Sequence, residues 1–307
     1  MEPILSIVVA IVSDTTGPGG TAHLEGCLGA LERQAHAPQM EILVPYDARI
    51  ASMAEFARRF PAVRFIRVEE FRGASPPRRG SREHHDELRG IGIRHARAPL
   101  VALLEDHGHA GARWCAALVK EHEQPYAAVG GAMENGVDRP LNWAVYFGDF
   151  GRYQNPVPRG PSATVSDANV CYKRAALERV ADAWAESYSE ARVHAALAER
   201  GETLALSPDV IVYQHRLDLR LGPALEERRV WGRSFAAARA EHMTLLCRAV
   251  YAALTPALPA ALLARQCRNI VRTKRNLGAF AKALPLTALL DLAWSWGEFL
   301  GYVTGVT

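Results

Sequence analysis

The chain has 307 residues, of which 49% are hydrophobic and 22% charged, a composition typical of a globular protein with a sizeable core. Its formal net charge of +3 is too small to indicate nucleic-acid binding, so we expect no nucleic-acid partner. The five cysteines are scattered and contain no Cys-x-x-Cys pair, which argues against a disulfide framework or a zinc cluster and favours a reducing, cytoplasmic location.

The N-terminal apolar run at 4–12 follows Glu2 and has no basic segment before it, so we interpret it as a strand rather than a signal peptide. Apolar and polar spacing then predicts strands and helices in turn. The expected strands lie at 6–12, 41–44, 63–68, 100–104 and 127–131, and the expected helices at 24–34, 53–60, 84–96 and 113–123. This alternation predicts an α/β fold with a doubly wound, mostly parallel sheet.

The strand at 100–104 consists of five apolar residues and runs directly into Glu105, Asp106 and His107. A run this short and this apolar is typical of a central parallel strand that is buried on both faces. Ligands of open α/β sheets bind beyond the carboxyl ends of such strands, where these three side chains could hold a divalent cation and a diphosphate. On these three residues alone, a solvated acidic turn explains the pattern equally well.

The alternation ends after Gly136. Residues 140–165 combine aromatic residues with prolines and are predicted to form a loop-rich wall for an acceptor. A helix is expected across 186–200 and a strand at 210–213, with His215 directly after that strand. Residues 71–82 are rich in Gly, Pro and Arg and are predicted to form a mobile loop.

The order of the motifs over about residues 4–235 resembles that of an inverting, family 2 nucleotide-sugar glycosyltransferase with the GT-A fold. Residues 104–107 stand where that family carries its Asp-x-Asp metal motif, and Asp47 stands where a carboxylate closes the second strand. Residues 167–174 are similar to the family's Gly-x-Asn-x-x-(Tyr/Phe)-(Lys/Arg)-Arg segment. The resemblance therefore implies a GT-A-type fold and a glycosyltransferase activity.

Two further matches follow later in the chain. Ser189-Glu190 stands where the family has Glu-Asp with its catalytic base, and residues 229–233 resemble its basic and tryptophan segment. The chain departs from the family pattern at Glu105 and His107, which replace two aspartates, and at Glu190, which replaces the usual Asp. These departures affect the metal ligands and the base more than the fold.

The resemblance implies a role for each matching residue. A divalent metal, Mn²⁺ or Mg²⁺, would be held by Glu105, His107 and His215 and would neutralise charge on the diphosphate leaving group. Glu190 would accept the proton of the acceptor hydroxyl, with Glu186 as the alternative because it precedes Glu190 by one helical turn. The nucleoside-diphosphate sugar donor would contact Asp14, Asp47, Arg89, Glu105, Asp106 and Asn169, and the acceptor would contact Trp231 and Arg233.

Each of these residues also has an ordinary structural explanation. Glu190 and Arg89 could be exposed helix residues, Asp47 could cap a turn, and His215 could end a strand without binding anything. Two other functions remain open. The Gly-rich loop at 17–21 suggests a sugar nucleotidyltransferase, although the basic residue expected after it is absent. The altered metal motif also allows a non-catalytic nucleotide-binding module at a membrane surface.

The C-terminal part is apolar and basic. Residues 243–263 are mostly apolar but interrupted by Arg248 and two prolines, and 284–303 carry four polar residues at helical spacing. No apolar run reaches 18 uninterrupted residues, so we expect no transmembrane helix. The basic residues between the two segments are Arg265, Arg268, Arg272, Lys274, Arg275 and Lys282.

We therefore expect a GT-A-like domain over 1–238 and a C-terminal amphipathic helical region over 239–307. The basic run predicts that this region docks peripherally on an anionic membrane, on its cytoplasmic face, without crossing it. A pair of soluble helices that covers the catalytic domain is the alternative. A lipid-linked acceptor would fit membrane docking but does not follow from it.

Overall fold

The structure is a computed structural model that describes residues 2–12, 22–50, 53–71, 82–241 and 243–305. Asp14, the Gly-rich loop at 17–21 and most of the predicted loop at 71–82 lie outside the described residues. Contacts divide the chain into two compact units, which are described separately below. The first unit comprises Met1–Glu134 and Asn155–His215, and the second comprises Asn135–Gln154 and Arg216–Thr307.

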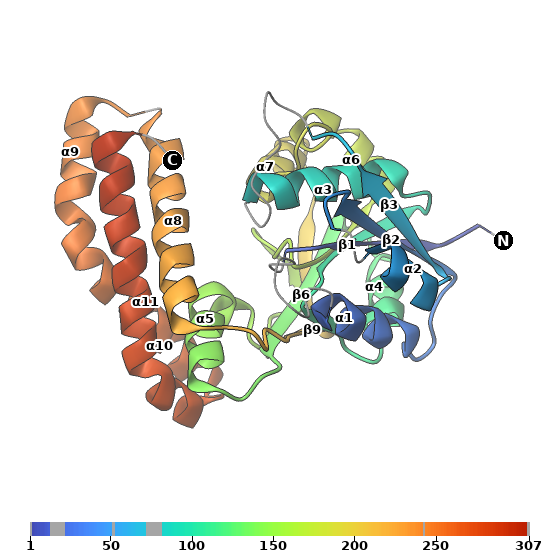
Figure 1. The fold of residues 1–307 in the computed structure, drawn as a ribbon, viewed down its shortest axis with the longest axis horizontal. Coiled ribbons are helices and arrows are strands. Elements are labelled where there is room, and N and C mark those ends of the chain that lie inside the picture. The colour runs from blue at the N-terminus through green and yellow to red at the C-terminus, as the bar shows by residue number, and fades with distance from the viewer. Residues whose placement is uncertain (1, 13–21, 51–52, 72–81, 242, 306–307) are drawn as a thin grey trace. The chain divides into compact units, whose positions relative to one another are not determined.

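The first unit is built on a mixed sheet (Figure 1). In the described part of the chain, its strand order is β3-β2-β1-β4-β8-β6-β9-β5, with β7 paired to β9. Strands β1, β2, β3 and β4 pair in parallel, whereas β8 runs antiparallel between β4 and β6. The strands are β1 (Leu5–Ala10), β2 (Met40–Asp47), β3 (Val63–Val68), β4 (Leu100–Glu105), β5 (Gly108–Ala110), β6 (Ala128–Asn135), β7 (Gly160–Pro161), β8 (Asn169–Lys173) and β9 (Leu204–Gln214).

Helices connect the strands of the first unit. They are α1 (Ala22–Glu32), α2 (Met53–Arg59), α3 (Arg82–His95), α4 (Trp114–Glu121), α6 (Arg174–Glu178) and α7 (Glu190–Glu199). Strand β1 is buried along its whole length, as expected for a strand covered on both faces. Helix α3 lies directly on β1 because Gly92 has no side chain; a Cβ atom there would overlap the side chain of Val8. The α/β fold predicted for the first 131 residues is therefore confirmed, with each element within a few residues of its expected position.

The second unit is helical. Its helices are α5 (Pro140–Asp149), α8 (Leu221–Ala240), α9 (Leu245–Leu254), α10 (Leu258–Thr273) and α11 (Leu277–Thr304). The prediction of a loop at 140–165 is wrong at its start, where the chain forms α5. Pro140 occupies the first turn of this helix, where proline is compatible with helical structure. The aromatic residues of α5 are at helical spacing and pack inward, and Phe147 meets Phe280 of α11 with ring centroids 5.0 Å apart.

Helix α8 packs against α11 through glycine. Cβ atoms at Gly232, Gly297 or Gly301 would each overlap backbone atoms of the other helix, so the two backbones approach very closely. Helix α8 thus belongs with the C-terminal helices by its contacts, and the C-terminal segment of this unit begins at Arg216, whereas the expected boundary was at 238.

Two helical stretches of the second unit, Leu245–Thr273 and Leu277–Thr304, are long and apolar enough to cross a membrane by length and composition. The sequence led us to expect no such helix, because we required 18 apolar residues without interruption. Single charged residues and prolines divide the apolar runs of both stretches.

Candidate functional site

The candidate site lies at the carboxyl ends of the parallel strands of the first unit. Strand β2 ends at Asp47 and β4 ends at Glu105, and helix α3 brings Arg89 to the same edge. Asp167, in the loop before β8, reaches Arg89 from the opposite side of β4 along the sheet. This edge is where ligands bind in open α/β sheets.

Arg89 joins three carboxylates from three segments of the chain. Its guanidinium donates to Asp86 Oδ1 at 3.0 Å and Glu105 Oε1 at 2.7 Å, and it lies 3.5 Å from Asp167 Oδ2. The residue is only 4% exposed. Burial alone would lower the pKa of Arg89, but these carboxylates raise it further above its usual range. Within the described residues its Nε has no hydrogen-bond partner, which leaves one buried donor for a ligand oxygen.

Glu105, Asp106 and His107 form a compact charged group after β4. His107 Nε2 lies 3.2 Å from Glu105 Oε2, and His107 Nδ1 lies 3.5 Å from Asp106 Oδ1. Asp106 is fully buried and accepts a hydrogen bond from the backbone N–H of Val12.

The charges of this group stabilise one another. Burial alone would raise the pKa of Glu105, but the hydrogen bond from His107 and the neighbouring cations lower it to about 2. Burial alone would lower the pKa of His107, but Asp106 and Glu105 raise it to about 9. Glu105 is therefore ionised and His107 protonated near neutral pH.

Asp47 lies at the same sheet edge and is almost completely buried. It accepts hydrogen bonds from the backbone N–H and the Nε of Arg49, both at 2.8 Å, and His84 Nε2 lies 3.2 Å from its other oxygen. Burial would raise the pKa of Asp47, but the bonds from Arg49 lower it. The carboxylate is therefore charged and already paired. A nucleobase that contacts Asp47 would have to share this carboxylate with Arg49 or displace Arg49 from it.

Asn169 has a structural position. Its Oδ1 accepts a hydrogen bond from Trp114 Nε1 at 2.8 Å, and its Nδ2 donates to the backbone oxygens of Ala132 and Val210 at 3.0 Å. The amide thus ties β8 to the neighbouring strands and has no donor left for a sugar. Asp167, two residues earlier in the same motif, is the member that reaches Arg89. The sequence motif contains both residues, and the donor contact was predicted for Asn169.

Glu190 is the first residue of α7, and Ser189 caps that helix by accepting from the backbone N–H of Arg192. The carboxylate lies 3.9 Å from His194 Nδ1. Because α7 begins at Glu190, Glu186 is not one turn earlier on the same helix, and the argument for it as the alternative base does not hold.

A buried network holds this segment beside Arg89. Tyr172 Oη lies 2.9 Å from His194 Nε2 and 2.8 Å from Tyr188 Oη. The backbone N–H of Tyr188 donates to the backbone oxygen of Asp86. Burial raises the pKa of Tyr172 well above its usual range, and both Glu190 and Asp167 raise it further. Both carboxylates therefore lie close enough to Tyr172 to act on it electrostatically.

His215 reaches the group through its backbone. Its N–H donates to the His107 oxygen at 2.8 Å, but its ring stacks on His109, with centroids 3.8 Å apart. The antiparallel pairing of β5 with β9 sets these two rings face to face. No three His, Cys, Asp or Glu side chains converge as metal ligands among the residues that the structure describes. The predicted three-residue metal site of Glu105, His107 and His215 is therefore not assembled.

Glu105 and His107 by themselves suit a divalent ion that is shared with a diphosphate. Carboxylate oxygen and imidazole nitrogen are donors that Mn²⁺ accepts. The 3.2 Å separation between Glu105 Oε2 and His107 Nε2 is a hydrogen-bond distance, so a metal bound here would take the place of the His107 Nε2 proton. These two side chains fit a metal that takes its remaining ligands from substrate phosphates and water.

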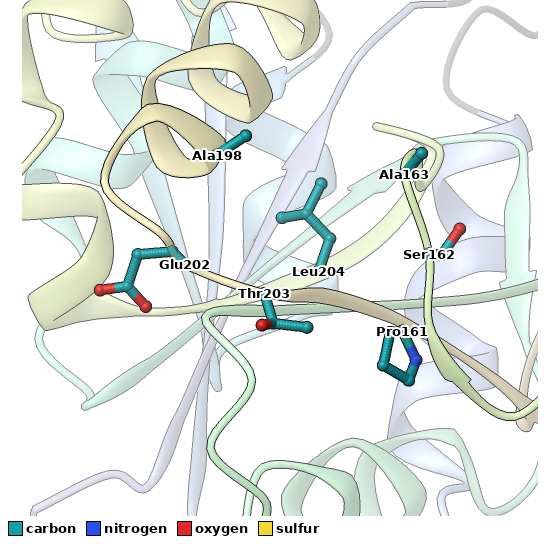
Figure 2. Close-up of a pocket in the computed structure, with 7 residues that line it drawn as sticks. All are labelled: Pro161, Ser162, Ala163, Ala198, Glu202, Thr203 and Leu204. Atoms are coloured by element: carbon teal, nitrogen blue, oxygen red, sulfur yellow. The ribbon is translucent and has the colours of Figure 1, made fainter.

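The predicted acceptor residues lie in the second unit. Trp231 and Arg233 are both on α8, and the guanidinium of Arg228 lies 5.6 Å from the centre of the Trp231 ring. A surface pocket of the first unit lies at the start of β9 (Figure 2), whereas His215 follows the other end of that strand. The pocket contains none of the predicted site residues and is lined by Pro161, Ser162, Ala163, Ala198, Glu202, Thr203 and Leu204.

No family model and no curated protein sequence matches the chain. Among solved structures, the fold is similar to that of mannosyltransferase PcManGT from Pyrobaculum calidifontis in complex with GDP-Man and Mn²⁺. The similarity has a TM-score of 0.50 and 18% sequence identity, and it covers 95% of this chain and 86% of that chain. At this identity it shows the fold alone, and the predicted GT-A-type α/β fold with a C-terminal helical part is thereby confirmed.

Proposed function

We propose that the chain is a glycosyltransferase that moves a sugar from a nucleoside-diphosphate donor to an acceptor hydroxyl, with inversion at the sugar carbon. The observation that carries this proposal is the group of Glu105, His107, Arg89 and Asp167 at the end of β4 in a glycosyltransferase fold. The solved neighbour binds GDP-Man and Mn²⁺. A nucleotide sugar and a divalent metal are therefore the ligands that we infer for this site.

Arg89 and the two donors after β4 would act on the diphosphate. A divalent metal, when bound by Glu105 and His107, would neutralise the negative charge that grows on the leaving group. Arg89 orients Glu105 through a 2.7 Å hydrogen bond and has a buried Nε donor available for a phosphate oxygen. A fixed cation of this kind stabilises the leaving group without reorganisation during the reaction.

Glu190 is the base that we propose for the acceptor hydroxyl. As the first residue of α7, it lies in the positive field of the helix N-terminus, which interacts favourably with a carboxylate. Tyr188 is two residues before it and is tied to Asp86 beside Arg89, so the base and the phosphate-binding group share one rigid framework. Attack from the face opposite the diphosphate would give inversion.

The test is binding followed by transfer. Purified full-length chain is titrated with GDP, UDP and ADP, with and without Mn²⁺, and thermal shift and calorimetry report binding. We expect one nucleotide to bind more tightly with Mn²⁺, and His107→Ala to remove that Mn²⁺-dependent gain. Glu202→Gln, at the pocket near the start of β9, is the matched control and should bind as the parent does.

The corresponding nucleotide sugars are then assayed for transfer or for hydrolysis of the donor. Binding without either reaction would contradict the enzyme proposal and favour the non-catalytic module. Nucleotide binding that is identical with Mn²⁺ and with excess chelator would contradict the metal part of the proposal. Release of pyrophosphate from a nucleoside triphosphate and a sugar phosphate would instead favour a nucleotidyltransferase.

A further inference from the structure

Helix α11 has its polar side inward and its apolar side outward. The four polar residues at helical spacing, Thr287, Asp291, Ser295 and Glu298, are all buried inside the second unit. The opposite side exposes a continuous apolar stripe that consists of Leu284, Leu289, Leu292, Trp296 and Val303. A surface helix in water shows the reverse arrangement.

The inward polar side chains have protein partners. Gln266 Nε2 donates to Asp291 at 3.2 Å, Trp294 Nε1 donates to Glu298 at 2.6 Å, and the Ser295 hydroxyl donates to the backbone oxygen of Thr255. The bonds of Gln266 and Thr255 join α11 to α10 and to the turn after α9, and the bond between Trp294 and Glu298 lies within α11. The inward orientation is therefore set by specific contacts, and the apolar stripe faces outward as a consequence.

Helix α9 extends the same apolar surface. Leu245 and Leu246 are 79% and 76% exposed, and Val250 and Leu254 are exposed as well. Its one charged residue, Arg248, donates to backbone oxygens at the end of α11, which places α9 beside the C-terminal half of that helix (Figure 1). A helix that is apolar on nearly all sides belongs in a protein core or in lipid.

The other end of the second unit is basic. Arg265, Arg268 and Arg272 lie on the exposed side of α10, and Lys274, Arg275 and Lys282 follow around the turn into α11. No Asp or Glu occurs from Arg248 to Leu290. The surface thus has an apolar part beside a strongly basic part, which matches acyl chains beside anionic headgroups.

We propose that the outer face of α9 and α11 inserts into an anionic lipid bilayer, with the basic residues of α10 and the following turn on the headgroups. Only this face of the second unit enters the bilayer. Helix α8 packs on α11 and carries exposed charges such as Glu226, so its own surface stays in water. A second copy of this face would bring the same positive charge and is disfavoured for that reason. This surface is independent of the glycosyl-transfer chemistry.

The experiment uses the one strongly exposed cysteine, Cys247 on α9. Cys267 is half-buried, and Cys27, Cys115 and Cys171 are buried, so a Cys267→Ser chain carries an environment-sensitive fluorophore at Cys247. The labelled full-length chain is mixed with vesicles of phosphatidylcholine alone or with phosphatidylglycerol. We expect flotation with the anionic vesicles, a blue-shifted emission, and quenching by lipids labelled within the acyl chains.

Variants separate the two parts of the surface. Leu245→Glu with Leu246→Glu should weaken vesicle binding at least tenfold, because both leucines lose burial in lipid. Arg268→Gln with Arg272→Gln should weaken binding to anionic vesicles about thirtyfold and reduce its salt dependence. Leu217→Glu, an exposed apolar position outside the helices, is the matched control and should bind as the parent does. Circular dichroism and thermal melting verify that each variant is folded.

Three outcomes would overturn the proposal. The first is a labelled chain that stays in the soluble fraction with anionic vesicles at low salt. The second is flotation with quenching by headgroup labels alone, because the apolar face would then lie outside the acyl region. The third is a stable dimer that Leu245→Glu with Leu246→Glu dissociates while vesicle binding is unchanged, which would make this face an interface between two copies.

Discussion

One guanidinium, that of Arg89, contacts carboxylates of α3, β4 and the loop before β8. A buried cation with three partners is costly to remove, because the carboxylates stay behind without compensation. We predict that Arg89→Met lowers the free energy of unfolding by about 3–5 kcal/mol at pH 7. Urea denaturation measures this change. Arg59→Met is the control, because the Arg59–Glu25 pair is exposed and should contribute below ~1 kcal/mol.

A loss equal to that of the control would mean that Arg89 is not the electrostatic centre of the site. The resemblance assigned Arg89 to the donor site, but its burial could not be recognised from the sequence, because an arginine in a predicted helix is usually exposed. Only the fold brings Asp86, Glu105 and Asp167 to it from three separate segments.

Glu190 supports a prediction about catalysis. Glu190→Gln keeps the shape of the side chain and removes the proton acceptor, so transfer should fall by ~10² or more with donor binding nearly unchanged. Steady-state kinetics and nucleotide titration measure the two effects. Glu186→Gln, before the helix, is the matched control and should keep its turnover. Normal turnover of Glu190→Gln would remove this residue from the mechanism.

At the scale of elements, the contact between α8 and α11 depends on glycine. A Cβ atom at position 297 would overlap the backbone oxygen of Arg229, so Gly297→Ala should lower the free energy of unfolding by about 1–3 kcal/mol. Thermal and urea unfolding measure this loss. Gly278→Ala, in the same helix with no atom near its Cβ position, should be neutral or raise stability by up to ~1 kcal/mol. Equal effects of the two substitutions would show that the close approach is not a constraint.

The elements differ in how far local pattern predicts them. Strand β4 was predicted because five apolar residues followed by charges describe a buried strand and its end. Helix α5 was missed because its proline was interpreted as a loop signal, although proline is compatible with a first helical turn. Helix α7 was predicted to begin four residues too early, because the polar residues before it gave no clear start.

At the scale of the whole molecule, two buried histidines predict sensitivity to acid. Burial lowers the pKa values of His122 and His194 to about 4, from about 6.5 in an unfolded chain. Between these pH values the unfolded chain binds more protons, so this contribution to stability is complete above about pH 6.5 and is lost as the pH falls towards 4.

We expect the free energy of unfolding to be about 1–2 kcal/mol lower at pH 5 than at pH 7 for each of the two histidines. Urea denaturation at the two pH values measures the difference. His122→Gln should reduce it, whereas substitution of the exposed His36 should not. A free energy of unfolding that is constant from pH 7 to pH 5 would contradict this assignment.

The sequence by itself determined the α/β class, the order of elements in the first 131 residues, and the presence of Glu105 and His107 at the end of a central strand. These features follow from short-range periodicity and from the general rule that strand ends carry ligand sites. Tertiary structure alone decided that Asp167 rather than Asn169 reaches Arg89, that the His215 ring stacks on His109, and that the polar side of α11 faces inward. The direction in which a side chain or a helix face points is set by partners far away in the sequence, and no local pattern contains that information.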